Sequence, residues 1–227
     1  MALRRHWLWL PFTLGLAACT SPGQEPSLNI EIIRAIQGAL KMRFEKKEER
    51  PPLTRAVLNT LEGSFLEATI ESRDQLAYLF VSATLRDELP GDIVVWRTED
   101  NVALVMRNDV LVGTKGLGND LIASEVQIRD GVWGPAGSGE RVAHLAVRDN
   151  KEQALGLACE VTDKGPQTVD IVEIRHSTRL IEEYCEGGGG SFTNQYWVDS
   201  RAGLIWQSRQ WVGPDVGYLF IRRLTTG

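Results

Sequence analysis

The segment that decides the fold is residues 196–224, YWVDSRAGLIWQSRQWVGPDVGYLFIRRL. It contains three short runs rich in aromatic and branched aliphatic residues, at Tyr196–Val198, Leu204–Val212 and Tyr218–Leu224. The turn-forming residues Asp199–Gly203 separate the first two runs. Runs of this length and composition, bounded by turn residues, are typical of β-strands that pair with their neighbours in sequence. The segment therefore predicts antiparallel strands.

The same pattern extends toward the N-terminus, with turn signals such as Ser72-Arg73-Asp74 and Glu99-Asp100-Asn101 between apolar runs. The further predicted strands are Phe65–Ile70, Leu76–Leu85, Ile93–Trp96, Val102–Met106, Val110–Thr114, Arg141–Val147, Ala154–Val161, Val169–His176 and Arg179–Cys185. Short strands at such regular spacing favour an antiparallel β-barrel or a sandwich. Because no helical pattern lies between them, a parallel βαβ sheet is disfavoured.

An amphipathic helix is expected before the strands, over residues 28–46. Leu28, Ile32 and Ile36 recur at the spacing of one helical face, and Pro51-Pro52 ends the pattern. A second short helix is predicted at Leu53–Thr60. We therefore expect a single mainly-β domain over residues 28–227 with a helix at its N-terminal end.

The composition excludes some classes of partner. The 227 residues include 25 Lys and Arg against 30 Asp and Glu, which gives a formal charge of −5. Binding to a polyanion requires a concentrated basic surface, and the sequence offers no basic run of that kind. Nucleic acid is therefore not an expected partner.

Residues 1–18 have the features of a secretory signal peptide. Arg4 and Arg5 precede the apolar run Trp7–Ala18. Spanning a bilayer takes about 20 apolar residues, so this run is too short for a transmembrane helix. The run ends in Leu16-Ala17-Ala18-Cys19, which resembles the lipobox of bacterial lipoproteins.

This resemblance implies cleavage before Cys19 and acylation of its thiol and its new amine with chains such as palmitate. Several acyl chains together give stable membrane anchoring, whereas one chain is marginal. Residues 19–27, which contain two prolines, would form a lipidated tether. Because Asp at the next position signals inner-membrane retention in this class, Thr20 indicates the outer membrane. The alternative is an ordinary signal peptide with an incidental cysteine.

Two cysteines, Cys159 and Cys185, remain after the lipidated one is set aside. An even number of cysteines in an oxidising compartment predicts a disulfide. Closing a loop of roughly 27 residues would stabilise the fold by about 3.5 kcal/mol in the chain-entropy model. Two separate buried thiols are the alternative.

Glycine-rich segments and histidines give no sign of a cofactor or a metal. Residues 113–120, GTKGLGND, lack the spacing of a phosphate-binding loop and indicate a turn between strands. Gly187–Gly190 predicts a hairpin tip or a mobile loop, with a ligand lid as the less favoured alternative. His144 and His176 have no second ligand at metal-binding spacing.

No catalytic residues are predicted. The sequence lacks the common hydrolase and metalloprotease motifs. The neighbouring Glu182 and Glu183 would point to opposite faces of a strand, which does not suit a shared acid–base site.

Tryptophans are the strongest remaining indication of a binding surface. Trp133, Trp197 and Trp211 are candidates for stacking against sugar rings. Trp206 and Trp211 are five residues apart, so on a regular strand they face opposite ways and at least one belongs to the core. Core packing is the favoured interpretation for most of the tryptophans.

Together these motifs resemble a known family, that of the YjbF/GfcB lipoproteins of group 4 capsule polysaccharide. The resemblance lies in the lipobox and in residues 113–121, Cys159, Cys185, Asn194–Asp199, Ile205–Trp211 and Pro214, and it runs from about Pro52 to the C-terminus. The glycines at 187–190 and the segment before Pro51 depart from the family pattern as we know it.

The resemblance implies a non-enzymatic accessory lipoprotein of exopolysaccharide or capsule secretion or assembly, on the periplasmic face of the outer membrane. Its implied partners are a periplasmic β-grasp protein and an outer-membrane β-barrel protein, and no cofactor comes with the family. Two alternatives remain: a glycan-binding module, or a polysaccharide-modifying enzyme if Asp120, Asp199, Glu182 or Glu183 meet in a pocket. A lipid-carrying apolar cavity is a further possibility.

Overall fold

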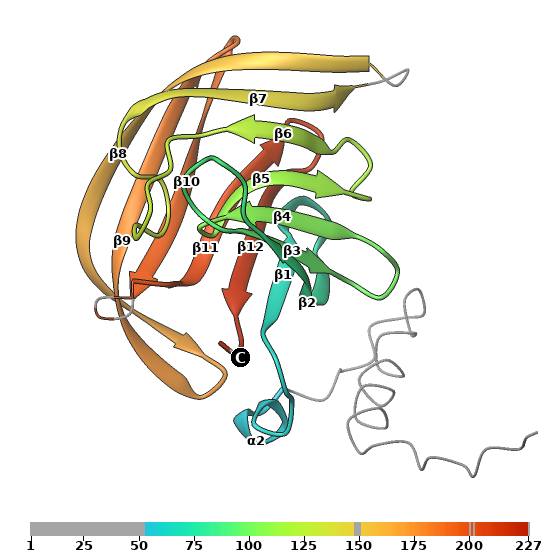
Figure 1. The fold of residues 1–227 in the computed structure, drawn as a ribbon, viewed down its shortest axis with the longest axis vertical. Coiled ribbons are helices and arrows are strands. Elements are labelled where there is room, and N and C mark those ends of the chain that lie inside the picture. The colour runs from blue at the N-terminus through green and yellow to red at the C-terminus, as the bar shows by residue number, and fades with distance from the viewer. Residues whose placement is uncertain (1–52, 148–150, 200, 202, 227) are drawn as a thin grey trace, which may run out of the picture.

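The structure is a computed structural model that describes residues 53–147, 151–199, 201 and 203–226 (Figure 1). The predicted signal peptide 1–18, the tether 19–27 with Cys19, and the helix 28–46 lie outside these residues.

Strands account for most of the described chain. Helix α2 spans Arg55–Leu58 and the short 3-10 turn η1 spans Glu71–Arg73. The strands found within the described residues are β1 Phe65–Ile70, β2 Gln75–Leu85, β3 Ile93–Arg97, β4 Ala103–Arg107, β5 Val110–Lys115, β6 Leu121–Glu125, β7 Gly139–Val147, β8 Lys151–Ile171, β9 Ile174–Gly187, β10 Gly190–Asp199, β11 Ile205–Gly213 and β12 Gly217–Arg223.

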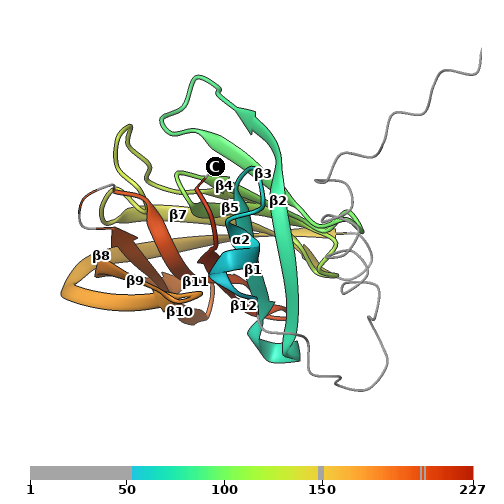
Figure 2. The same cartoon turned by 90° about the horizontal axis from the view of Figure 1, so that it is seen from below.

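The described strands form one antiparallel sheet in the order β5-β4-β3-β2-β1-β12-β11-β10-β9-β8-β7-β6. Nearly every neighbour in the sheet is also a neighbour in sequence, and β1 pairs with β12 to join the two halves. The sheet curls until its two end strands, β5 and β6, lie side by side (Figures 1 and 2). The mainly-β antiparallel prediction is therefore confirmed, and the form is a nearly closed barrel.

Side chains connect β5 and β6 where the barrel closes. The Leu121 amide donates to Thr114 Oγ1 at 2.9 Å, and the same hydroxyl donates to Asp120 Oδ1 at 2.9 Å. Asp120 also accepts from the amides of Gly116 and Leu117. Residues 116–120 are thus a turn held by one carboxylate, as predicted for this glycine-rich segment.

The predicted strand Val169–His176 is wrong, because it crosses the tip of the long β8–β9 hairpin. Val172 and Glu173 form the turn, with φ values of 41° and 68°. A branched residue such as Val rarely adopts a positive φ, so these two residues carry no recognisable turn signal. Strand β6 was not predicted at all, since its alternation is short and partly polar.

Helix α2 fixes this hairpin tip against the body of the barrel. The Arg55 guanidinium donates to the carbonyls of Ile171, Val172 and Leu224 at 2.9, 3.2 and 3.0 Å. Leu58 of the same helix is buried in a cluster with Ile171 and Leu224. The helix predicted over Leu53–Thr60 is present as this shorter element, and its contacts explain why the strained turn persists.

A candidate ligand cavity at the mouth of the barrel

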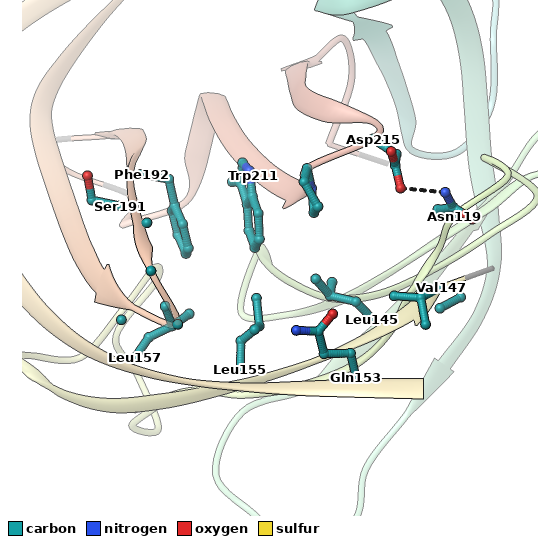
Figure 3. A pocket seen from close by; sticks show the side chains of 17 residues that line it. Asn119, Leu145, Val147, Gln153, Leu155, Leu157, Ser191, Phe192, Trp211 and Asp215 are labelled. Carbon is teal, nitrogen blue, oxygen red and sulfur yellow. Dashed lines mark hydrogen bonds between the residues drawn. The ribbon is translucent and has the colours of Figure 1, made fainter. Parts of the chain in front are cut away.

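One end of the barrel lumen holds a cavity of about 360 Å³ (Figure 3). It lies between the paired ends of β7 and β8, the tip of the β9–β10 hairpin and the β11–β12 turn. Its lining comprises Asn119, Leu145, Ala146, Val147, Gln153, Leu155, Leu157, Gly187, Gly188, Gly189, Gly190, Ser191, Phe192, Trp211, Gly213, Pro214 and Asp215. The volume falls within the roughly 300–1,000 Å³ usual for small-molecule sites. We call it the mouth cavity.

Alternate residues of β8 form one wall of the mouth cavity. Gln153, Leu155 and Leu157 occupy alternate positions and so share the lumen face. Gln153 is exposed, Leu155 is half-buried and Leu157 is buried, so the wall becomes more apolar with depth. Leu145 on the adjacent β7 pairs in register with Gln153 and extends the apolar wall.

Two stacked rings form the opposite wall. Phe192 of β10 and Trp211 of β11 lie with ring centroids 4.3 Å apart and planes at 12°. Figure 3 shows both rings projecting toward Leu155 and Leu157. The β11–β12 register shifts at Trp211, and its amide donates to the Asn194 side-chain oxygen at 2.7 Å. Trp211 packs against the main core cluster, whereas Trp206 packs against the separate cluster around Leu58 and Ile171.

The four glycines at 187–190 form a tight hairpin tip over the cavity. Gly188 and Gly189 are the turn between β9 and β10 and have positive φ values. A Cβ atom on Gly187 would lie 2.3 Å from the Gly156 carbonyl oxygen of β8. Glycine at 187 is therefore required by a close approach of two strands, and the prediction of a hairpin tip is correct.

Polar groups of the mouth cavity gather at its rim. Asn119 Nδ2 donates to Asp215 Oδ2 at 2.5 Å and joins the β5–β6 turn to the β11–β12 turn (Figure 3). Gln153 and Ser191 lie at other points of the lining. Asp215 is the one acidic or basic side chain among the described lining residues.

Deeper in the lumen, a single carboxylate gathers three donors. Glu183 Oε2 accepts from Arg141 Nη1 at 2.8 Å, Asn194 Nδ2 at 2.8 Å and the Tyr196 hydroxyl at 3.1 Å. All four side chains are buried, with Glu183 2% exposed. We call these four residues the buried network.

Burial and charge act together on the titration of this network. Burial first, and then the Glu183 charge, raise the pKa of Tyr196 well above its usual 10.0. For Arg141 the burial alone would lower the pKa, but the Glu183 charge and the hydrogen bonds raise it overall. Arg141 also donates to Ser124 Oγ and to the Leu111 carbonyl. The ion pair therefore connects β7 and β9 to β5 and β6 across the lumen.

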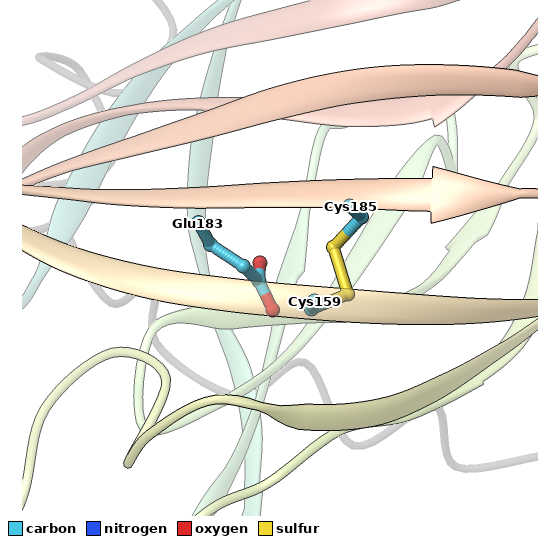
Figure 4. Close-up of side chains that lie close together, drawn as sticks. All are labelled: Cys159, Glu183 and Cys185. Carbon is cyan, nitrogen blue, oxygen red and sulfur yellow. A yellow bond between two sulfur atoms is a disulfide. The ribbon is translucent and has the colours of Figure 1, made fainter.

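The predicted disulfide is present and lies beside the buried network. Cys159 and Cys185 face each other on β8 and β9, next to Glu183 (Figure 4). The two sulfurs and a Glu183 oxygen lie within 4.8 Å of one another, a grouping that could in principle hold a metal. Thiolates bind metals, however, and both sulfurs are committed to the disulfide.

The three tryptophans predicted as a glycan-stacking set do not lie together. Trp211 lines the mouth cavity. Trp197 lies toward the opposite end of β10, where its Nε1 donates to Gln167 Oε1 at 2.8 Å. Trp133 is 37% exposed in the β6–β7 loop beside Gly203. A stacking role for any of them stays a prediction.

The four carboxylates that could have indicated an enzyme do not meet in the mouth cavity. Asp120 holds the β5–β6 turn, and Asp199 accepts from Trp206 Nε1 at 2.7 Å. Glu182 faces away from Glu183, as strand alternation predicts, and lies 3.3 Å from Lys164 Nζ.

His144 and His176 are engaged in separate structural contacts. His144 Nδ1 lies 2.5 Å from Glu152 Oε1, and the His176 ring stacks on Trp206 with centroids 3.6 Å apart.

Among the described residues, no helix has the length and apolar character needed to cross a membrane.

Sequence reasoning missed the lumen residues that make this site. Leu145, Leu155 and Leu157 lie on predicted strands but were not among the predicted site residues. Which inward positions border open space depends on barrel closure, and that is a property of the whole sheet. The Arg141–Glu183 pair is separated by 42 residues and carries no local signal.

Comparison with known proteins assigns this barrel to a class of envelope lipoproteins. The family model described as "Group 4 capsule polysaccharide lipoprotein gfcB, YjbF" matches residues 33–224. The chain therefore belongs to this family, and the resemblance inferred from its motifs is confirmed. Membership places the protein in a capsule-polysaccharide and cell-envelope context.

A solved structure shares the fold. The crystal structure of the hypothetical lipoprotein YmcC from Escherichia coli (K12) matches with a TM-score of 0.66 at 18% identity. The match covers 90% of this chain and 99% of that one. No curated protein matches the chain.

Proposed function

We propose that this protein is a non-enzymatic accessory factor in the secretion or assembly of exopolysaccharide or capsule. In this proposal residues 1–18 are removed, Cys19 carries the acyl chains, and residues 19–27 connect it to the barrel. The lipid anchor holds the protein on the periplasmic face of the outer membrane.

Family membership over residues 33–224 is the observation that carries the proposal. The geometry agrees with a non-enzymatic role, because Asp120, Asp199 and Glu182 are each engaged in structural contacts away from the mouth cavity. Asp215 alone would have to supply acid–base chemistry there, whereas polysaccharide cleavage usually uses two carboxylates.

The proposed mode of action is contact with other envelope proteins of polysaccharide export. The partners would be a periplasmic β-grasp protein and an outer-membrane β-barrel protein, with the polysaccharide itself as a further contact. A lipid anchor concentrates the barrel at the membrane surface, where even weak contacts become effective.

The test is a pulldown of the lipidated protein from detergent-solubilised envelopes of cells that produce the polysaccharide. Cys19→Ala is the matched control, because it removes the predicted anchor and leaves the barrel sequence intact. We expect polysaccharide-export proteins with the native chain and their loss with Cys19→Ala. Recovery of no export protein with the native chain would overturn the proposal.

A glycan-binding module is the second candidate, favoured by the placement of Trp211 in the mouth cavity. One face of that ring is taken up by Phe192, so a sugar could stack only on the other face. Recovery of polysaccharide without export proteins in the same pulldown would favour this candidate.

A further inference from the structure

The leucine wall and the aromatic wall of the mouth cavity carry few side-chain groups that could hydrogen-bond to a ligand. Leu145 and Leu157 are almost fully buried, and Leu155 lies between Leu157 and the exposed Gln153. Across from them stand the rings of Phe192 and Trp211. These side chains are part of the lining of a space of about 360 Å³. Leucine and aromatic surfaces such as these favour contact with an apolar molecule over contact with water.

The apolar lining favours a hydrocarbon chain over a sugar as the ligand. A sugar ring placed against the leucines would lose water from its hydroxyls without gaining protein partners, which is costly. A hydrocarbon chain loses nothing there, and each buried methylene adds to affinity. The polar side chains Asn119, Gln153 and Asp215 belong to the lining near its edge, where they suit a polar end group.

The polar side chains at the edge of the mouth cavity also indicate the charge of the ligand's polar end group. Asp215 is the one acidic or basic lining side chain among the described residues, and Asn119 already donates to it. An anionic head at this position would be repelled by the like charge of the exposed Asp215 carboxylate, and screening by water keeps this repulsion modest. An uncharged hydroxyl or amide head could instead hydrogen-bond to the side chains of Gln153 and Asn119.

We propose that the mouth cavity binds the hydrocarbon chain of an amphiphile with an uncharged polar head. The deep end of the chain contacts Leu157 and Phe192, and the head lies between Gln153 and Asp215. This inference goes beyond the accessory role, because it assigns a ligand class to a cavity and does not depend on any protein partner.

The binding test uses the full chain with Cys19→Ser, so that no attached acyl group competes for the cavity. The probe is N-phenyl-1-naphthylamine, whose fluorescence rises in apolar surroundings, and it is displaced by decanol, decanoate or maltose at pH 8. We expect displacement by decanol, about fivefold weaker displacement by decanoate, and none by maltose. Displacement by maltose, or no displacement by decanol, would overturn the proposal.

One variant locates the binding site, and one control matches it. Leu155→Asn places an amide in the wall and should weaken decanol binding about tenfold. Leu85→Asn makes the same substitution at an exposed leucine of β2, and should leave binding within about twofold. Equal losses in both variants would show that the probe does not report on the mouth cavity and would contradict the proposal.

Asp215→Asn tests the head-group part at a surface turn, where folding is not at stake. Decanoate should then bind about as well as decanol, while decanol itself is unchanged. Unchanged discrimination against decanoate would overturn the role given to Asp215. Because these readouts come from the purified chain, they stand apart from the envelope pulldown, and either result can fail without the other.

Discussion

The mouth cavity and the buried network share strands but are built from opposite chemistry. On β10, Phe192 lines the cavity, and the next lumen-facing positions, Asn194 and Tyr196, belong to the network. In the network, every side chain donates to or accepts from another through bonds of 2.8 to 3.1 Å. In the cavity, leucines and aromatic rings surround open space.

The buried network therefore stabilises the barrel, whereas the mouth cavity is the region suited to a ligand. Buried polar groups stabilise a fold only when their partners are fixed, so the network specifies one arrangement of β5, β7, β9 and β10. Apolar walls need no fixed partner, so the cavity can remain open without leaving a polar atom unpaired. Asn194 connects the two regions, because it donates to Glu183 and accepts from the amide of Trp211.

Removing the charge at the centre of the network should have the largest effect. Glu183→Gln leaves the Arg141 guanidinium buried without a counter-ion, and breaking such a pair costs about 3–5 kcal/mol. The free energy of unfolding, measured by urea denaturation, should fall by that amount.

Glu182→Gln is the matched control for Glu183→Gln. It makes the same change one residue away, on the outer face, where Glu182 pairs with the half-exposed Lys164. Surface pairs contribute about 0–1 kcal/mol, so this variant should unfold close to the native chain. Similar losses in the two variants would mean that the network is not the fixed centre described here.

The disulfide beside the network should have the next largest effect. Replacing both Cys159 and Cys185 by Ala removes a cross-link that closes a loop of roughly 27 residues, with an expected loss of about 3.5 kcal/mol. The native chain under reducing conditions should lose a similar amount, while the double variant should be insensitive to reductant. A double variant that still responds to reductant would show that the effect lies outside this disulfide.

Most of the fold could be predicted from local sequence patterns. The hairpins around Asp74 and Asn101 were marked by turn residues, and both adopt positive φ as such residues allow. The choice between a barrel and a sandwich could not be made, because it depends on whether β5 and β6 meet. That meeting rests on Thr114 and Asp120, whose role becomes visible only when the strands are in place.

The candidate site was less predictable than the fold. Trp211 was named as a candidate for aromatic character alone, and its place in the cavity is held by the hydrogen bond from its amide to the Asn194 side chain. Trp197 has the same character, but it packs beside Gln167 near the opposite end of its strand. Residue type therefore identified candidates, while long-range register decided which of them borders open space.

Asn194→Ala should disturb both regions at once. It removes a donor to the Glu183 carboxylate and leaves the partly buried amide of Trp211 without its acceptor, with a combined cost of about 3 kcal/mol. Decanol binding in the probe assay should weaken as well, because Trp211 loses the contact that places it.

The neighbouring Gln195→Ala is the control for Asn194→Ala. Gln195 lies on the outer face and donates to Glu182 at 2.9 Å, so its loss should change stability by only about 0.5 kcal/mol and leave binding intact. If Asn194→Ala destabilised the fold but left decanol binding unchanged, the two regions would be independent.

Tyr196→Phe should have the smallest effect at neutral pH and a distinct dependence at alkaline pH. It removes one of three donors to Glu183, at a cost of about 1.5 kcal/mol for a hydrogen bond to a charged group. Because burial raises the pKa of Tyr196 above 10.0, the native state keeps this proton while the unfolded chain releases it. The stability that the hydroxyl contributes is thus complete below pH 10 and declines above it.

The size of the pH effect follows from the difference between the pKa of Tyr196 in the native state and in the unfolded chain. One pH unit above the unfolded pKa, the native chain loses about 1.4 kcal/mol that Tyr196→Phe does not lose. The stability difference between the two proteins should therefore close near pH 11, as measured by urea unfolding at a series of pH values. Tyr218→Phe serves as the control, since Tyr218 is only partly buried and its hydroxyl accepts from the Thr193 amide without taking part in the buried network. A difference for Tyr196→Phe that stayed constant from pH 7 to 11 would mean that the hydroxyl ionises as easily in the barrel as in the unfolded chain, and the network would then be open to solvent.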